Sequence, residues 1–226
     1  MSSCSKSNSL ISNVKFLSNS VSGNLFLPTT SVFKFFNFWL LDQKFEKIKN
    51  SNVLFYRKEV CSSKIPLLKY AIIDFEGDPT TLVGITIANQ IFQLYVKDLL
   101  HQAEFFNLIL ELLFILRDFY LFSFSNYEQR VIQGILESLG VFSSEKYLFV
   151  RNLKIINLQK FSFEALIPAL YSINKDVYND PLLRDSKKVN LHFKQGHYDL
   201  ILDHNRSCLL SILKIVKYRY LKEVLI

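Results

Sequence analysis

Two acidic residues stand two positions apart at the end of an apolar stretch, in the segment Tyr70-Ala-Ile-Ile-Asp-Phe-Glu-Gly-Asp-Pro79. Alternate residues of a β-strand share a face, so Asp74 and Glu76 should point away from the side that carries Ile73 and Phe75. Neighbouring carboxylates repel each other and lose hydration, and a divalent cation offsets both costs. Oxygen ligands favour Mg²⁺ or Mn²⁺ over Zn²⁺. The pair therefore predicts a magnesium or manganese site; the alternative is an exposed acid pair at a strand end.

A second acidic motif, Phe122-Ser-Phe-Ser-Asn-Tyr-Glu128, includes the end of the fourth predicted strand. Glu128 would open a helix, where a first-turn acid beside an Asn cap is also common without any function. Tyr127 could stack on a base. Two divalent cations about 3.5–4 Å apart activate water and stabilise the leaving oxygen of a phosphodiester. A site of this kind would bring Glu128 within about 8 Å of Asp74 and Glu76.

These motifs resemble those of a known nuclease superfamily. The run from Asp74 to Pro79, followed directly by a strand that contains Gly84, resembles the first motif of the ribonuclease-H-like DEDD 3′–5′ exonucleases, in particular the branch associated with RecB-type nucleases. Members of that branch continue with an Asn/Gly-x-Tyr-Glu segment, which the run from Phe122 to Asn126-Tyr127-Glu128 resembles. They end with a His/Tyr-Asn-x-x-Asp helix, which residues 203–211 match in part. The resemblance covers roughly residues 67–226.

The resemblance implies a role for each matched acid. Asp74 and Glu76 would bind the inner Mg²⁺ or Mn²⁺, and Glu128 would complete the site directly or through water. Cys208 stands where the family has its final Asp. Asp203 could replace that Asp only on a rotated or shifted helix, because it lies about 140° round the helix from position 208. The site is therefore either rearranged and weak, or inactive.

The motifs leave several functions open. The first is a divalent-metal 3′–5′ exonuclease with an incomplete site, in which no general base is evident beyond His204. The second is a non-catalytic nucleic-acid-binding or complex subunit that kept the exonuclease fold and has a protein partner. A purely structural protein without a nucleic-acid role is a third alternative.

The charge pattern suits a protein that binds a polyanion near a cation. The net charge is +7 and the pI is near 9.2. Residues 184–226 carry nine Lys or Arg against four Asp or Glu, whereas residues 98–145 carry seven acids against two Arg. This asymmetry favours single-stranded DNA or RNA as a partner, although solvated Lys faces would give the same pattern. The candidate contacts to nucleic acid are Asn126, Tyr127, Lys187, Lys188, Asn205 and Arg206.

The chain is expected to have three parts. Residues 1–30 form a weakly ordered Ser-rich leader, residues 31–66 a small N-terminal appendage, and residues 67–226 the exonuclease-like domain. Strands are predicted over 67–76, 81–88, 90–96, 119–124 and within 146–158, and helices over 99–117, 127–139, 161–173 and from about 199. Residues 174–196 are expected to be irregular. The order of elements predicts an α/β fold with a mixed β-sheet flanked by helices, which the resemblance makes ribonuclease-H-like.

No membrane span is predicted, because the longest apolar run, Phe105 to Leu116, is interrupted by Asn107 and Glu111 and is shorter than the roughly 20 residues that a bilayer needs. The three cysteines form no CxxC and leave one unpaired, so neither a disulfide framework nor a zinc site is expected. This cysteine usage favours an intracellular, cytoplasmic location. The leader lacks Arg and so fits a frayed terminus better than an organelle transit peptide, which is the alternative.

Overall fold

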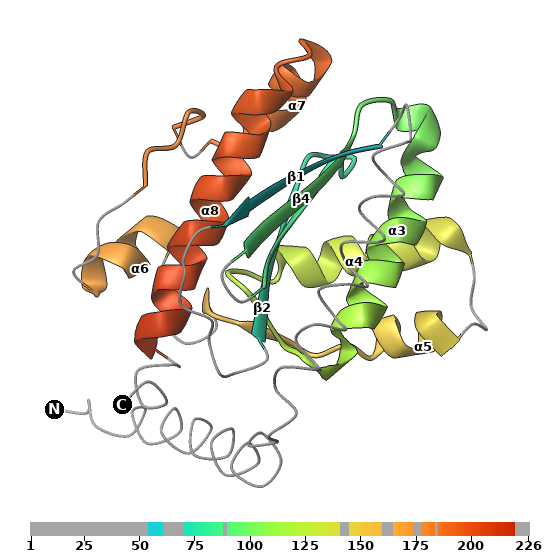
Figure 1. Cartoon of the computed structure of the whole chain (residues 1–226), viewed down its shortest axis with the longest axis horizontal. Coiled ribbons are helices and arrows are strands. Elements are labelled where there is room, and N and C mark those ends of the chain that lie inside the picture. The colour runs from blue at the N-terminus through green and yellow to red at the C-terminus, as the bar shows by residue number, and fades with distance from the viewer. Residues whose placement is uncertain are drawn as a thin grey trace, which may run out of the picture.

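A computed structural model describes residues 54–60, 70–87, 90–140, 145–159, 165–173, 178–183 and 185–219. It contains a mixed six-stranded sheet with the order β1-β4-β3-β2-β5-β6 (Figure 1). The strands are β1 (Leu54–Val60), β2 (Tyr70–Glu76), β3 (Leu82–Ile87), β4 (Gln90–Val96), β5 (Tyr120–Ser123) and β6 (Ile155–Asn157). The helices are η1 (Leu99–His101), α3 (Gln102–Ile115), η2 (Leu116–Asp118), α4 (Tyr127–Leu139), α5 (Glu145–Arg151), α6 (Leu166–Ser172), α7 (Lys187–Lys194) and α8 (Tyr198–Arg219). The predicted α/β class, with a mixed sheet flanked by helices, is confirmed.

Strand β2 lies inside the sheet and pairs in a different way on each side. On one side β2, β3 and β4 form an antiparallel meander, and β1 pairs antiparallel with β4. On the other side β5 pairs parallel with β2, and β6 pairs parallel with β5. Parallel strands end at the same edge of a sheet, so the segments that follow β2, β5 and β6 gather there. This edge is where open α/β sheets bind their ligands.

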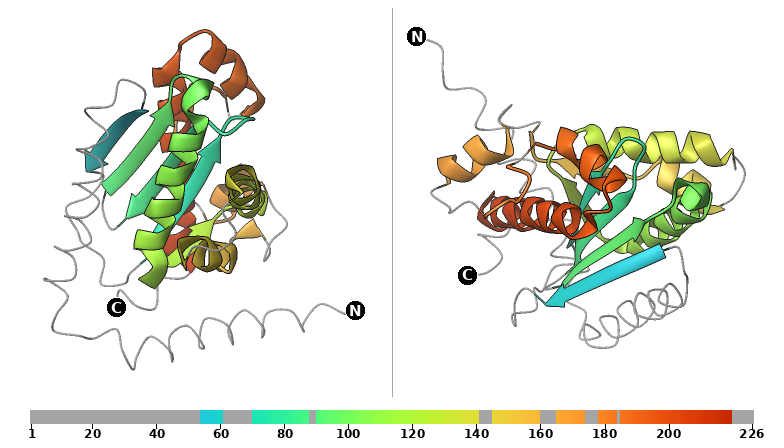
Figure 2. Two further views of the ribbon diagram at one scale, coloured as in Figure 1. Left: turned by 90° about the vertical axis from the view of Figure 1, so that its right-hand side faces the viewer. Right: turned by 90° about the horizontal axis from the view of Figure 1, so that it is seen from above.

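Helices cover both faces of the sheet, as Figure 2 shows from two further sides. On one face α3, α4 and α5 share a core with Ile73 of β2. On the other face α6 and α8 share a core with Ile72. The alternation predicted along β2 is therefore confirmed. It directs Asp74 and Glu76, which share a face with Ile72, toward α8.

Strand β1 comes from the predicted N-terminal appendage but extends the main sheet. It pairs with β4 from Leu54 opposite Val96 to Val60 opposite Gln90. This part of residues 31–66 is therefore continuous with the main domain. The remainder of the appendage, the leader and the boundary expected over residues 61–66 lie outside the described residues.

Two segments differ from the structure that the sequence predicts. Residues 145–151 form the helix α5, and only Ile155–Asn157 of the predicted fifth strand is extended. Tyr147 and Val150 of α5 are buried in the same core as α3, so packing of a helical face outweighs the β-propensity of this segment. Residues 174–196, which were expected to be irregular, contain the helix α7. Its Val189 is buried in a small hydrophobic cluster together with Ile201 and Leu202 of α8.

One helical stretch, Leu99–Asp118, is long and apolar enough to cross a membrane by length and composition. It includes α3, whose inner face buries Phe105, Ile109 and Leu113 against the sheet. The core helix of a globular domain meets the same criterion. In this structure 39% of the apolar window is buried, and the lack of a membrane span stays a prediction.

Candidate metal centre

Three acidic side chains reach one cleft from separate segments. Asp74 and Glu76 lie at the end of β2 with 8% and 4% of their surface exposed, and Glu128 in the first turn of α4 is 3% exposed. The cleft encloses about 550 Å³. Its other lining residues come from the turn after β2, the start of α4, and α6, α7 and α8: Phe75, Gly77, Asp78, Phe124, Ser125, Tyr127, Leu166, Ser186, Lys187, Asn190, Cys208 and Ile212. The structure thus brings the acid pair and the second motif together.

The start of α4 is fixed against the turn that follows β2. The phenol of Tyr127 donates a hydrogen bond to the carbonyl oxygen of Gly77 (3.1 Å). The Oγ of Ser125 accepts a hydrogen bond from the backbone N–H of Tyr127 (3.0 Å) and donates one to Oε2 of Glu128 (3.2 Å). Asn126 is exposed and makes no capping bond; its side-chain oxygen accepts a hydrogen bond from an Asn of β6. The side chain of Ser125, and not that of the N-cap residue Asn126, therefore binds the first turn of α4 and orients Glu128.

Burial and mutual repulsion disfavour the charged forms of these groups. The pKa of Asp74 is raised well above its ordinary value by burial, then by the charges of Glu76 and Glu128. Burial also raises the pKa of Glu128 from 4.5 to about 7 and that of Tyr127 from 10.0 to about 12, with Glu76 contributing to both shifts. A divalent cation in the cleft would reverse these shifts, because it favours ionised oxygen ligands.

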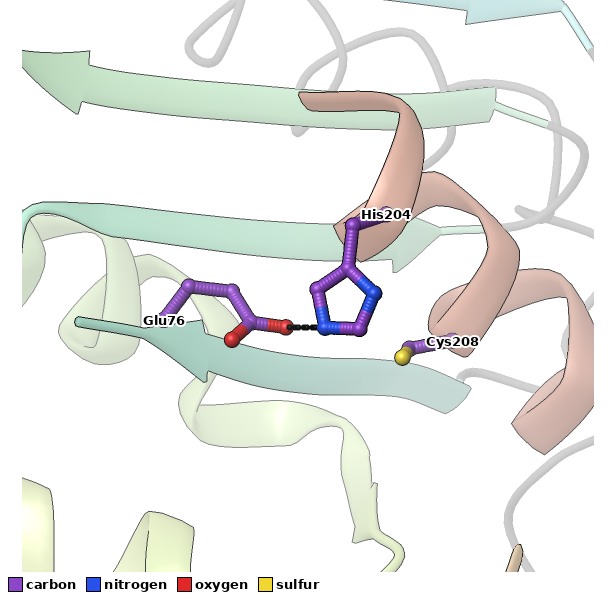
Figure 3. Close-up of side chains that lie close together, drawn as sticks. All are labelled: Glu76, His204 and Cys208. Carbon is purple, nitrogen blue, oxygen red and sulfur yellow. Dashed lines mark ion pairs between the residues drawn. The ribbon is translucent and has the colours of Figure 1, made fainter. Parts of the chain in front are cut away.

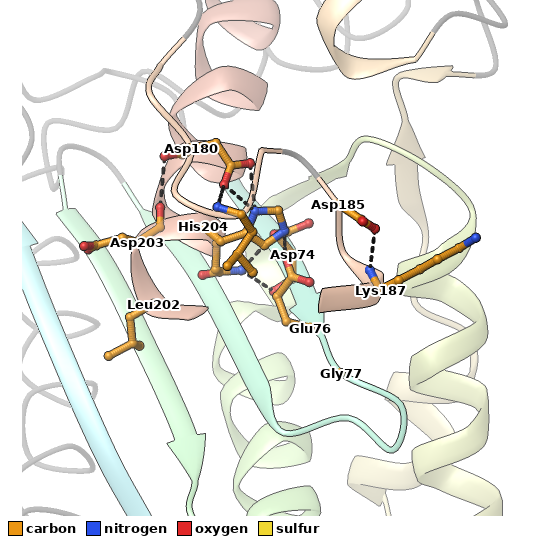
Figure 4. A network of polar contacts seen from close by, with 12 residues as sticks. Asp74, Glu76, Gly77, Asp180, Asp185, Lys187, Leu202, Asp203 and His204 are labelled. Atoms are coloured by element: carbon orange, nitrogen blue, oxygen red, sulfur yellow. Dashed lines mark hydrogen bonds and ion pairs between the residues drawn. The ribbon is translucent and has the colours of Figure 1, made fainter. Parts of the chain in front are cut away.

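His204 of α8 is the positively charged partner of this acid group (Figure 4). Its Nδ1 lies 2.8 Å from both carboxylate oxygens of Asp180, and its Nε2 lies 3.2 Å from Oε1 of Glu76. Burial by itself would lower the pKa of His204, but the hydrogen bond with Asp180 and the contact with Glu76 raise it to about 10. Without a cation in the cleft, the two carboxylates therefore favour the protonated imidazole, which cannot accept a proton from water. The role of His204 as the general base stays a prediction.

Asn205 positions Asp74 and does not face the cleft. It has no exposed surface; its Nδ2 donates a hydrogen bond to Oδ2 of Asp74 (2.8 Å), and its Oδ1 accepts one from Nε2 of Gln93 (2.8 Å). Gly84 allows this close approach of α8 to β3, because a Cβ at this position would collide with the side-chain oxygen of Asn205. In this structure Asn205 therefore serves to hold Asp74, and the contact to nucleic acid that the sequence suggested for it stays a prediction.

The remaining candidates on α8 divide between the cleft and the surface. Cys208 lies one helical turn beyond His204 and lines the cleft. Burial, followed by the charges of the surrounding acids, raises the pKa of its thiol well above the ordinary value. Asp203 is exposed, Arg206 is partly exposed, and neither belongs to the described lining of the cleft. The structure therefore does not bring Asp203 to the position of the missing acid.

The two lysines that were predicted to contact nucleic acid are neighbours in the first turn of α7 but have different surroundings. Lys187, in its first turn, lines the cleft. Lys188 instead lies with its Nζ 4.0 Å from Oδ2 of Asp185. Asn190 ties α7 to the turn after β2, because it exchanges two hydrogen bonds with the backbone of Asp78 (3.0 and 2.8 Å). Lys187 is therefore the lysine placed to meet a ligand in the cleft.

Two residues that orient the site lie outside the sequence motifs, Asp180 and Gln93, whereas Ser125 belongs to the second motif. Asp180 is 6% exposed, yet in the sequence it precedes Pro181 and looks like an ordinary turn residue. Gln93 could have been noticed, because an amide in the middle of an apolar strand requires a polar partner when it is buried. That rule gives no indication of which residue the partner is.

Comparison of the chain with models of protein families, with curated proteins and with solved structures gives no match. The family expected from the motifs therefore remains a prediction. The interpretation of the cleft depends on its own geometry.

Proposed function

We propose that this chain is a ribonuclease-H-like protein that binds single-stranded DNA or RNA at a divalent-cation site, and that it hydrolyses the bound strand weakly or not at all. The observation that carries the proposal is the convergence of Asp74, Glu76 and Glu128 in one cleft. Three buried carboxylates cost free energy unless a cation neutralises them. Such clusters with raised pKa values are typical of functional sites.

The strand order supports the ribonuclease-H-like part of the proposal. Such domains have an antiparallel meander of three strands, and two further strands extend the sheet parallel to the first. Here β2, β3 and β4 form the meander, and β5 and β6 extend it parallel to β2, while β1 is an addition at the edge. The resemblance implies acids on the first strand and at the start of the helix after the fourth, which are the positions of Asp74, Glu76 and Glu128.

The ligand atoms in the cleft suit Mg²⁺ or Mn²⁺. Asp74, Glu76 and Glu128 offer carboxylate oxygens, the ligands that both ions prefer. When bound, such cations supply activated water and stabilise the leaving oxygen of a phosphodiester. Cys208 does not suit these ions, because a thiol is a soft ligand. The cleft therefore offers one oxygen ligand fewer than the resemblance implies.

The protein's own side chains can hold a strand without cleaving it. Lys187 lines the cleft, and its flexible side chain could bring an ammonium group to a phosphate bound there. Tyr127 lines the same cleft, and its ring could stack on a base. His204 is held between Asp180 and Glu76, with its Nε2 3.2 Å from Oε1 of Glu76. The missing oxygen ligand at Cys208 leads us to expect slow hydrolysis.

Degradation of a labelled single-stranded oligonucleotide tests the proposal. We expect little or no hydrolysis with Mg²⁺, a trace with Mn²⁺, and a gain of about tenfold or more with Mg²⁺ on Cys208→Asp. Asp74→Ala should abolish the gained activity. Robust Mg²⁺-dependent degradation by the unaltered chain, lost on Asp74→Ala, would contradict the weak site. Failure to bind any single-stranded oligonucleotide would contradict the proposal as a whole.

A further inference from the structure

Three ligand atoms of different elements meet where the acid pair faces α8 (Figure 3). A carboxylate oxygen of Glu76, a ring nitrogen of His204 and the sulfur of Cys208 all lie within 4.8 Å of one another. His204 and Cys208 are four residues apart on one helix, so they share a face, while Glu76 approaches from β2. This group includes nitrogen and sulfur, which distinguishes it from the carboxylate group of Asp74, Glu76 and Glu128.

Asp180 gives His204 the orientation of a metal ligand. Metal-binding histidines almost always donate their second ring N–H to a carboxylate or carbonyl, which fixes the tautomer and leaves the other nitrogen for the metal. Nδ1 of His204 lies 2.8 Å from Asp180. Nε2 is buried and directed toward Glu76; it lies 3.2 Å from the carboxylate but forms no hydrogen bond of good geometry. Nε2 is thus the atom that is available to a metal.

We propose that Glu76, His204 and Cys208 form a zinc site. Zn²⁺ binds Cys sulfur, His nitrogen and carboxylate oxygen in tetrahedral geometry at about 2.0–2.3 Å. Such bonds separate the ligand atoms by roughly 3.3–3.8 Å, so atoms already within 4.8 Å of one another need only small side-chain rotations. Binding releases the Nε2 proton of His204 and the thiol proton of Cys208 to solvent, because both must be deprotonated to coordinate.

Two of the three proposed zinc ligands, His204 and Cys208, border open space. A second pocket of about 210 Å³ is lined by Asp180, His204 and Cys208, among others. Water or an external ligand can therefore complete the coordination, as in zinc sites that keep an open position. The inference deepens the proposed function, since Glu76 serves both groups and Zn²⁺ should compete there with Mn²⁺. It does not require that the chain bind nucleic acid.

Cobalt titration of the metal-free full chain tests this inference. Cys4→Ser and Cys61→Ser provide a background in which Cys208 is the remaining thiol of three. We expect one Co²⁺ per chain, with the near-ultraviolet absorption of a cobalt–thiolate bond, and displacement by one equivalent of Zn²⁺. Cys208→Ser and Cys208→Ala should abolish the absorption, and Asp180→Asn should weaken binding about 10–100-fold. Asp199→Asn, an exposed change in the first turn of α8, is the matched control and should alter nothing.

Two comparisons separate this inference from the proposed function. Glu128→Gln should weaken Mn²⁺ binding but leave the cobalt–thiolate absorption intact, whereas Cys208→Ser should do the reverse. Absence of the absorption in the background chain at saturating Co²⁺, or its persistence in Cys208→Ala, would overturn the zinc site alone. A cobalt–thiolate signal in a chain that binds no Mn²⁺ would support the zinc site and overturn the proposed function.

Discussion

The two walls of the cleft offer different kinds of ligand. The acid wall, formed by Asp74, Glu76 and Glu128 from β2 and α4, presents only carboxylate oxygens. The helix wall, formed by α8, presents the sulfur of Cys208 at the cleft and, within 4.8 Å of it, a ring nitrogen of His204, which lines the second pocket. Hard cations prefer the first set and zinc accepts the second. The difference teaches that one cleft can offer hard and soft ligands side by side, so that the two proposed sites would prefer different metals.

The walls also depend on each other. Asn205 holds Asp74 by a hydrogen bond, and His204 contacts Glu76, so α8 positions the acids that it faces. Gly84 of β3 sets how closely the two walls approach. Some changes should therefore affect one wall alone, whereas others should affect both.

The largest effect should follow removal of an oxygen ligand from the acid wall. Asp74→Asn keeps the size of the side chain but removes its charge, and we expect Mn²⁺ affinity to fall about 100-fold or more. Isothermal titration calorimetry of the purified chain measures this. Glu137→Gln, an exposed change at the far end of α4, is the control and should leave the affinity unaltered. Equal Mn²⁺ affinity in the Asp74→Asn and control chains would place the cation elsewhere.

A change that separates the walls should cost stability and metal affinity together. In Gly84→Ala the added methyl group meets the side chains of Asn205 and Leu209, so α8 must move away from β3. Overpacking of this kind should lower the free energy of unfolding by about 2–3 kcal/mol. Gly134→Ala is the control, because a Cβ there meets nothing within 4 Å. Urea unfolding measures both variants, and equal stability of the two would show that the walls do not touch as described.

The charge of the acid wall should appear as a pH dependence of stability. The pKa of Glu128 is raised from 4.5 to about 7, chiefly by burial. A group with a raised folded-state pKa stabilises the fold fully below its unfolded pKa, and this stability is lost as the pH rises through the folded pKa. Without divalent cations, the free energy of unfolding should therefore fall between pH 4.5 and about 7, with Glu128 responsible for about 3 kcal/mol.

Urea unfolding of Glu128→Gln over the same pH range checks this assignment. The free energy of unfolding of this variant should fall less between pH 4.5 and about 7, because an amide does not titrate. The exposed control Glu137→Gln should retain the full decline. If the free energy of unfolding of the Glu128→Gln variant and of the unaltered chain changes with pH in the same way, Glu128 is not the group whose ionisation lowers the stability.

The smallest effect should come from the lysine at the cleft. Lys187→Ala should weaken binding of a single-stranded oligonucleotide about threefold and reduce the salt slope by about 0.7, because one phosphate contact is lost. Lys188→Ala is the matched neighbour, and its pairing with Asp185 predicts a smaller change. Fluorescence anisotropy between about 50 and 200 mM salt measures both. Binding that ignores salt over this range would favour a protein partner over a nucleic acid.

Much of the fold could be predicted from sequence because its signals are local. Alternation along β2 placed Ile72 and Ile73 on opposite faces, and Gly140 correctly ended the helix α4. The helices α5 and α7 could not be predicted in this way, since burial of Tyr147 and of Val189 depends on neighbours that are distant in the chain. Local propensity says nothing of such contacts.

The site could be predicted on one wall only. The spacing of Asp74 and Glu76 indicated a shared face, and the second motif indicated Glu128. The helix wall depends on pairs that no spacing reveals, such as Asp180 with His204, which are 24 residues apart. The same limit explains why the separated cysteines and histidines gave no indication of zinc: one ligand of the proposed site is a carboxylate from another strand.

The position of a bound cation tests the central claim most directly. Crystals of the full chain grown or soaked with Mn²⁺ can be measured at the manganese absorption edge, where anomalous scattering locates the ion without reference to its surroundings. The account predicts an anomalous peak bounded by the carboxylates of Asp74, Glu76 and Glu128, which is lost in crystals of Asp74→Asn. A peak elsewhere, or no peak in the cleft at saturating Mn²⁺, would contradict it.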